Sequence, residues 1–185
     1  MKKIIIIALS MVVLPFAIHA QGIGIGVKAG ANFANQSISD ISTSSITNFH
    51  GGAYVNLMFS EKFGIAPEIL WTATGSEWDD VKVNTNYVAI PVMLHYKLIN
   101  PLFIEAGPQF SFLTSAEHDT FDDFEDQLKN NDFGLAFGAG IGLPLGLKAG
   151  LRYVLGFTNI SEVSDTEVKN RVFQIYAGWT LLGAK

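Results

Sequence analysis

The segment from Asp132 to Thr158, DFGLAFGAGIGLPLGLKAGLRYVLGFT, constrains the fold of this chain most strongly. In each half, large apolar residues alternate with glycine and a few charged residues, and an alternation of period two is typical of β-strands. Between the halves, Pro144-Leu145-Gly146 predicts a tight turn. The segment therefore predicts a β-hairpin with one apolar face and one face of glycines and charges.

The same alternation recurs elsewhere and predicts six further strands, at residues 23–34, 48–59, 63–74, 86–98, 102–115 and 170–181. Each is close to the ~9–11 residues with which a β-strand crosses a bilayer. Long polar connections, at 35–47, 75–85, 116–131 and 159–169, alternate with short turns. In outer-membrane barrels the short turns face the periplasm. We therefore predict an all-β fold, an eight-stranded antiparallel up-and-down transmembrane β-barrel, with both termini on the periplasmic side.

Charges are segregated between the two faces of these strands. On the apolar face only Arg171, at a strand end, is charged. The other face carries the ionisable residues Lys28, His50, Glu68, His95, Lys97, Glu105, Lys148 and Arg152. A lipid-facing Lys or Arg at mid-membrane costs roughly 2–4 kcal/mol, so the apolar face is expected to contact lipid. The alternative is a soluble, lipocalin-like barrel with its apolar face inside.

The N-terminus has the pattern of a secretory signal peptide: Met1-Lys2-Lys3, a short apolar run and a small residue, Ala20. We expect residues 1–20 to be removed and residues 21–185 to form the barrel, located in the bacterial outer membrane with lipid around it. The chain has no cysteine, which excludes a lipoprotein anchor and disulfides. Its net charge of -5 is unfavourable for nucleic-acid binding.

Several motifs resemble a known family. They are GVKAGANFA, PEILWTATGS, NYVAIPVMLHYKL, FIEAGPQFSFL, DFGLAFGAGIGLPLGLKAGLRYVLGFTNI and KNRVFQ. Together they resemble the PorT-like outer-membrane β-barrel family of Bacteroidota, over essentially the whole mature chain. The resemblance implies an outer-membrane barrel and names no activity. The namesake's link to type IX secretion is not carried over, because no motif here marks it.

Four charged residues are predicted to meet inside the barrel: Lys28, Glu68, Glu105 and Arg152. They lie four to six residues into four strands that run in the same direction, and all point inward. Gly138, Gly140 and Gly150 are expected to leave room for the long Arg152 and Lys28 side chains. Because the interior of an eight-stranded barrel is only wide enough for side chains, we expect an ion cluster that plugs the lumen. Further lumen-facing polar residues that could complete its hydrogen bonds are Tyr54, His95, Gln109, Gln174 and Tyr176.

The longest loop contains a candidate helix. Thr120 and Asp123 form a capping box, and Phe121, Phe124 and Leu128 recur at helical spacing. We expect a short amphipathic helix over 121–129 on the external side, whose apolar edge caps the barrel mouth or contacts lipid headgroups; the alternative is a solvated acidic loop. The external loops as a whole are the expected contact for an envelope protein partner.

Evidence for chemistry is sparse. No two of the histidines His50, His95 and His118 have a metal-ligand spacing, so no metal or cofactor is expected. The best hydrolase candidate pairs His50 with Ser111 or Thr72. We predict a non-enzymatic structural or envelope-interaction barrel; the alternatives are a narrow channel or small-ligand-binding barrel and, third, a membrane-embedded hydrolase. Pro67, Pro91 and Pro108, inside three neighbouring strands, predict bulges or a locally parted ladder.

Overall fold

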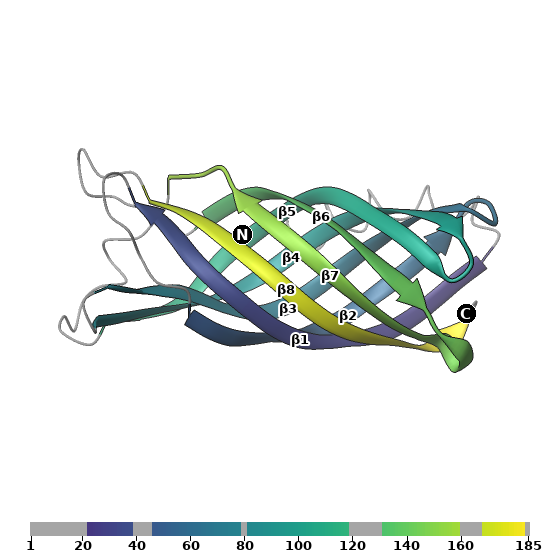
Figure 1. The fold of residues 1–185 in the computed structure, drawn as a ribbon, viewed down its shortest axis with the longest axis horizontal. Helices are drawn as coiled ribbons and strands as arrows, with labels where there is room; N and C mark the ends of the chain where they lie inside the picture. The colour runs from purple at the N-terminus through teal and green to yellow at the C-terminus, as the bar shows by residue number, and fades with distance from the viewer. Residues whose placement is uncertain (1–21, 39–45, 79–80, 119–130, 160–167, 184–185) are drawn as a thin grey trace, which may run out of the picture.

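The computed structural model describes residues 22–38, 46–78, 81–118, 131–159 and 168–183. These residues form eight strands: β1 (Gly22–Ile38), β2 (Ile46–Met58), β3 (Phe63–Trp78), β4 (Val81–Ile99), β5 (Leu102–His118), β6 (Asn131–Gly142), β7 (Leu147–Gly156) and β8 (Val168–Gly183). Each strand pairs antiparallel with its neighbour in sequence, and β8 pairs with β1 to close the barrel (Figure 1). The predicted fold class is confirmed. The signal peptide and the loop helix over 121–129 lie outside the described residues.

The expected polar loop at 75–85 is wrong. β3 and β4 continue into it as paired strands up to Trp78 and from Val81, and Ser76 is paired with Val83 and Trp78 with Val81. The polar composition of the segment favours a loop, but polarity indicates contact with water and not the absence of a strand. Alternation reveals a strand only where its two faces meet different surroundings, so a polar stretch without alternation can still form a strand.

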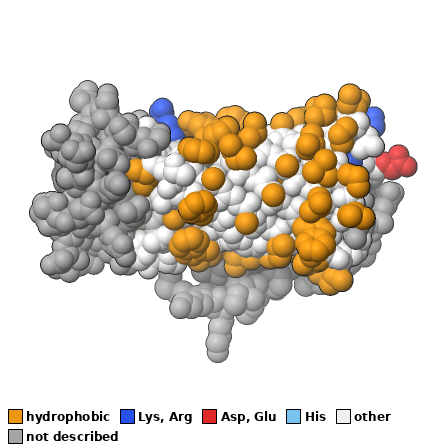
Figure 2. All heavy atoms as spheres, turned by 60° about the horizontal axis from the view of Figure 1, so that its bottom comes forward, with side chains coloured by type: hydrophobic (Ala, Val, Ile, Leu, Met, Phe, Trp, Pro, Cys, Tyr) orange, Lys and Arg blue, Asp and Glu red, His pale blue; other side chains and the backbone are white. Residues whose placement is uncertain are grey.

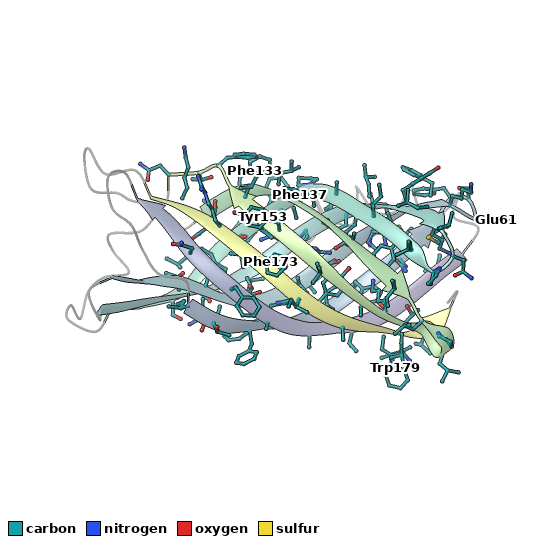
Figure 3. All side chains as sticks on the ribbon, viewed as in Figure 1. Glu61, Phe133, Phe137, Tyr153, Phe173 and Trp179 are labelled. Atoms are coloured by element: carbon teal, nitrogen blue, oxygen red, sulfur yellow. The ribbon has the colours of Figure 1, made fainter. Side chains whose placement is uncertain are left out.

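The outer wall of the barrel is apolar. Large apolar side chains at alternate positions are exposed on most of the strands, among them Trp71 at 52 %, Leu151 at 49 % and Ile175 at 45 %. Figure 2 shows one side of this wall, on which charged side chains of the described residues appear only at the two ends. Aromatic residues such as Phe173 and Trp179 project away from the strands (Figure 3). This wall matches the lipid-facing surface of a barrel that crosses a membrane.

The strand ladder parts near the three prolines, as predicted. Pairing of β2 with β3 runs to Tyr54↔Glu68 and resumes at Leu57↔Ile65. Between β3 and β4 the interruption lies between Pro67↔Val92 and Leu70↔Ala89. Between β4 and β5 it lies between Pro91↔Gln109 and Leu94↔Ala106. The register is the same on both sides of each interruption, so the ladder opens locally without a bulge.

The short connections lie together at one end of the barrel, where β1 begins and β8 ends (Figure 1). The β6–β7 connection is a single turn of 3-10 helix, Pro144–Gly146, which confirms the predicted tight turn. The β2–β3 turn is held by the Ser60 hydroxyl, which accepts hydrogen bonds from the backbone N–H groups of Lys62 and Phe63. Within the described residues, no helix is long and apolar enough to span a membrane.

Candidate functional site

The structure brings Lys28, Glu68, Glu105 and Arg152 together inside the barrel, and these four residues are called the ion cluster below. All four are buried, with exposed fractions of 3, 3, 2 and 1 %. The Arg152 guanidinium donates to Glu68 through both terminal nitrogens, at 2.9 Å each, and to Glu105 through Nε at 2.8 Å. Lys28 Nζ donates to Glu68 Oε1 at 2.6 Å. The cluster therefore contains two cations and two carboxylates joined by direct hydrogen bonds.

The cluster crosses the lumen from wall to wall. Arg152 lies on β7 and Glu68 on β3, which are separated by three strands in either direction around the eight-stranded ring. Strands so related face each other across a barrel. The hydrogen bonds between the two side chains therefore span the interior. Because an eight-stranded barrel is only wide enough for side chains, a charged bridge at this level fills much of its cross-section.

Two of the five predicted polar partners join the cluster. The Tyr176 hydroxyl donates to Glu105 Oε1 at 3.1 Å, and the face of its ring lies 4.1 Å from Lys28 Nζ. His95 Nε2 lies 3.0 Å from Glu105 Oε2, although the angle does not make a regular hydrogen bond. The histidine ring also stacks on Phe103, with centroids 5.4 Å apart. These contacts add aromatic surface and a polar partner around the Glu105 carboxylate.

Two of the three predicted glycines, Gly140 and Gly150, make room for aromatic rings. A Cβ on Gly150 would collide with the Tyr176 ring, and one on Gly140 would collide with the Phe103 ring. A Cβ on Gly138 would meet backbone atoms of β7 instead. The expectation that these three glycines accommodate Arg152 and Lys28 is therefore wrong in detail. The period-two pattern identifies inward positions, but it does not show which opposing side chain occupies the space.

The other three predicted polar partners bond elsewhere. Gln109 donates to Ser111 at 3.2 Å, within its own strand, and the Tyr54 hydroxyl lies 2.9 Å from that of Thr180. Gln174 belongs to a second buried group, which we call the amide layer. Its members are Asn32, His50, Thr72 and Gln174.

Asn32 is the centre of the amide layer, on the long-loop side of the ion cluster. Its Oδ1 atom accepts from Gln174 at 3.0 Å and lies 2.7 Å from His50 Nδ1. Its Nδ2 atom donates to Thr72 Oγ1 at 2.8 Å. Sequence analysis missed this residue. The available signal was that Asn32 is a polar residue at an inward position of its strand.

The hydrolase candidate does not assemble. His50 and Thr72 both contact Asn32 and are not hydrogen-bonded to each other. Ser111 receives its hydrogen bond from Gln109. A nucleophile needs a base within hydrogen-bond reach, and neither predicted pair provides one.

Glu68, His95 and Glu105 together resemble a metal-ligand set, because one ligand atom from each lies within 4.8 Å of the others. These residues come from three different strands, so no sequence spacing could reveal the group. Both carboxylates already accept hydrogen bonds from Arg152, and Glu68 also from Lys28. A divalent cation would add to two positive charges already present. The set therefore does not fit a metal ion.

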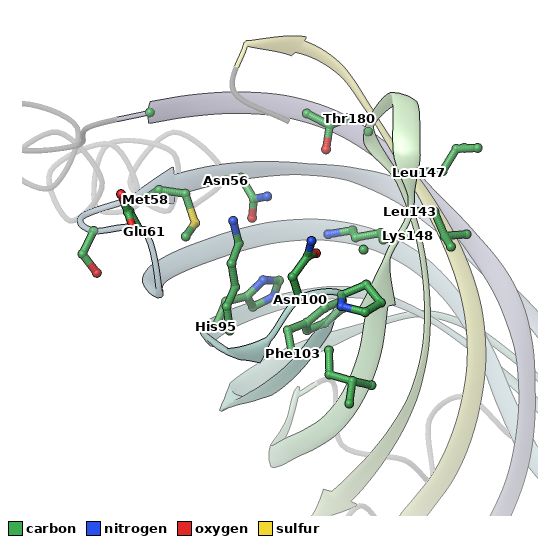
Figure 4. A pocket seen from close by; sticks show the side chains of 17 residues that line it. Asn56, Met58, Glu61, His95, Asn100, Phe103, Leu143, Leu147, Lys148 and Thr180 are labelled. Carbon is green, nitrogen blue, oxygen red and sulfur yellow. The ribbon is translucent and has the colours of Figure 1, made fainter.

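A cavity of about 600 Å³ opens at the short-turn end of the barrel (Figure 4). Residues of the three short turns form its rim, and Asn56, His95 and Lys148 extend into it. Lys148 is 8 % exposed, and its Nζ atom lies 3.6 Å from the centroid of the Tyr54 ring. We call this cavity the mouth pocket. It lies on the opposite side of the ion cluster from the amide layer.

Comparison with solved structures finds the same architecture in other outer-membrane proteins. Neisserial surface protein A superposes with a TM-score of 0.57 at 14 % identity, over 86 % of this chain and 99 % of that one. For OprG of Pseudomonas aeruginosa the TM-score is 0.52 at 15 % identity, over 87 % and 96 %. For the outer membrane enzyme PagL it is 0.51 at 12 % identity, over 84 % and 99 %. At such identities the likeness establishes the fold alone.

The family of this chain is identified from its sequence. No curated protein matches it. A family model described as an outer membrane protein beta-barrel domain matches residues 19–162, most of the chain. With a closed eight-stranded antiparallel barrel and an apolar outer wall, the match supports location in the outer membrane. The chain belongs to the outer membrane protein beta-barrel domain family.

Proposed function

We propose that this protein is a non-enzymatic barrel of the outer membrane with a plugged lumen, which acts in envelope structure or interaction through its external loops. The observation that carries the proposal is the hydrogen bonding of Arg152 on β7 to Glu68 on β3, across the barrel. A continuous pore would have to pass the ion cluster and then the amide layer. With the interior filled, function is left to the rims and the connections.

Conductance tests the plug. Wild-type protein reconstituted in a planar bilayer should give no steady current. The double variant Glu68→Ala/Arg152→Ala removes both ends of the bridge while leaving the net charge unchanged, and it should show measurable conductance. Lys62→Ala/Glu61→Ala, on the exposed β2–β3 turn, is the charge-matched control and should behave as wild type. Stable porin-like channels from the wild type would overturn the proposal.

The finer assignments belong to the same proposal. The motifs that resemble PorT-like proteins support membership of that group within the wider family, and the N-terminal pattern supports cleavage after Ala20. By the rule that short turns face the periplasm, the mouth pocket opens to the periplasm and the long connections face outward. An envelope protein is the proposed partner of those connections.

A second candidate function, a small-ligand-binding barrel, is favoured by the mouth pocket. Ligand sites commonly occupy about 300–1,000 Å³ in the mouths of barrels, and this cavity measures about 600 Å³. A hydrolase is the third class. The PagL structure shows that this fold also occurs in an enzyme, but the bonding of His50 to Asn32 supports the non-enzymatic reading here.

A further inference from the structure

The mouth pocket holds polar atoms that lack partners. Within the described residues, Asn56 Oδ1 and Lys148 Nζ are buried and make no hydrogen bond, and both side chains line the cavity. Buried polar groups are normally satisfied, and each exception calls for a cause. The Lys148 ammonium lies 3.6 Å from the centroid of the Tyr54 ring and forms no direct ion pair with the described residues. A cation–π contact contributes roughly 0.5–2 kcal/mol and leaves the three N–H donors of the ammonium unused.

The charge balance of this half of the lumen points to an anion. Lys28 and Arg152 are matched by Glu68 and Glu105, so the ion cluster is neutral in total. Lys148 is then a surplus buried cation, and none of the described ion pairs includes it. The two other charged residues lining the pocket, Glu61 and Lys97, are exposed at the rim, opposite in sign and screened by water. One negative charge would make the pocket neutral.

The walls around this cation are largely apolar. They are formed by Met58, Pro101 and Phe103, whereas the rim residues Leu102, Leu143 and Leu147 are 42–44 % exposed and belong to the outer wall. A hydrated inorganic ion gains nothing from such walls, whereas an apolar group on the ligand would remove their surface from water. Gly178 permits the close approach of the Lys148 stem, because a Cβ at that position would contact it. The lysine is thereby held against the inner wall with its head group at the cavity.

We propose that the mouth pocket binds a monocarboxylate with an apolar body, whose carboxylate accepts hydrogen bonds from Lys148 Nζ. The Asn56 amide, which can present its nitrogen after a simple rotation, lies in the same cavity as a second donor. The apolar body lies against Met58, Pro101 and Phe103. This inference rests on the ligand-binding candidate function and adds the ligand class; it does not depend on whether the lumen conducts ions.

Calorimetry on protein in nanodiscs, with empty nanodiscs as the blank, tests the proposal. Sodium hexanoate is the probe, and 1-hexanol is its neutral counterpart. We expect saturable binding of hexanoate and none of hexanol. Lys148→Met should weaken binding by about tenfold or more, since a hydrogen bond to a charged group contributes about 1.5–3 kcal/mol. Lys62→Met removes one exposed charge at the same end of the barrel, outside the pocket, and should leave affinity unchanged.

A second variant keeps the test independent of how well Lys148→Met folds. Asn100→Asp adds a negative charge to an exposed turn residue that lines the pocket, without changing its shape, and should weaken binding several-fold.

The source of the carboxylate is distinguished with acetyl-leucyl-leucine and its C-terminal amide. If the dipeptide acid binds and hexanoate does not, the ligand is the C-terminus of a peptide. If hexanoate binds, the ligand is a free acid. The proposal is overturned if neither acid binds, if the neutral analogues bind equally well, or if Lys148→Met retains full affinity.

Discussion

Arg152 is the residue on which the lumen network depends. It is 1 % exposed and hydrogen-bonds to both carboxylates of the ion cluster. A buried ion pair is weak evidence of net stability, because desolvation offsets much of the attraction. Removing one partner has a different outcome, since it leaves a buried charge without compensation. Replacement of all four cluster residues together should therefore cost less stability than removal of any one of them.

Glu105→Ala should destabilise the barrel by about 3–5 kcal/mol, because Arg152 and Tyr176 both lose an acceptor in a buried site. The free energy of unfolding in urea, measured with protein folded into lipid vesicles, gives the value. Glu61→Ala, on the exposed β2–β3 turn, should change it by less than about 0.5 kcal/mol. Equal stability of the Glu105→Ala variant and the wild type would contradict the buried network.

The meeting of the four cluster residues could be predicted because two simple rules suffice. Alternation gives the inward direction, and the distance from the strand end gives the height. The neighbours of the cluster could not be predicted in the same way. Tyr176 and His95 reach Glu105 whereas Gln174 reaches Asn32, and that choice depends on the stagger between strands and on the shapes of opposing side chains.

At the scale of the element, the β6–β7 turn contains a local conflict. Leu145 has φ 64° and ψ 15°, a left-handed conformation that residues other than Gly, Asn and Asp rarely adopt. Its side chain is 77 % exposed, so packing with the described residues does not explain the choice of leucine. Its carbonyl accepts a hydrogen bond from Trp179 Nε1 at 3.1 Å, which ties the turn to β8.

Leu145→Asn should stabilise the protein by up to about 1 kcal/mol, because asparagine tolerates the left-handed region and the backbone contact to Trp179 is kept. The urea midpoint in detergent micelles is a suitable measure, since micelles reduce the influence of bilayer contacts. Leu147→Asn, at φ -73°, is the matched control and should bring no such gain. If both changes have the same effect, backbone strain at Leu145 is not the cause.

Strand boundaries were predicted best where lipid imposes alternation and worst beyond it. The short-turn ends of β3 and β5 begin at the predicted residues, whereas the β3–β4 hairpin extends past the predicted ends. The three prolines, in contrast, allowed a correct prediction of where the strand ladder is interrupted. Each removes a ladder donor, and the ladder opens beside each without a change of register.

At the scale of the whole molecule, the apolar wall lies outside and the polar residues lie inside, which is the reverse of the arrangement in soluble proteins. The apolar residues are exposed, and the described buried set includes charged residues from five strands. This reversal excludes the lipocalin-like alternative, whose apolar face lies inside. It was predictable because lipid penalises every outward charge, so the segregation is visible in each strand separately.

Leu151→Arg measures that penalty directly. Leu151 faces outward beside Arg152, near the middle of the wall, and is 49 % exposed. In vesicles the substitution should destabilise the protein by roughly 2–4 kcal/mol. Leu145→Arg places the same charge on the turn tip and should cost about 0–1 kcal/mol. If the two variants were equally stable, Leu151 would not lie at the hydrocarbon core of the bilayer.

The distribution of the ion cluster over β1, β3, β5 and β7 also bears on how the barrel is completed. A sheet that acquires its strands in chain order already holds Glu68 and Glu105 when Lys28 is its only cluster cation. Arg152, which hydrogen-bonds to both carboxylates, joins with β7, the last strand but one. β8 then pairs with β1 and closes the barrel. The charges of the cluster are balanced only when β7 joins the sheet, one strand before the ring closes. A sheet that lacks β7 therefore holds one carboxylate more than it has cluster cations, and the addition of β7 removes this imbalance.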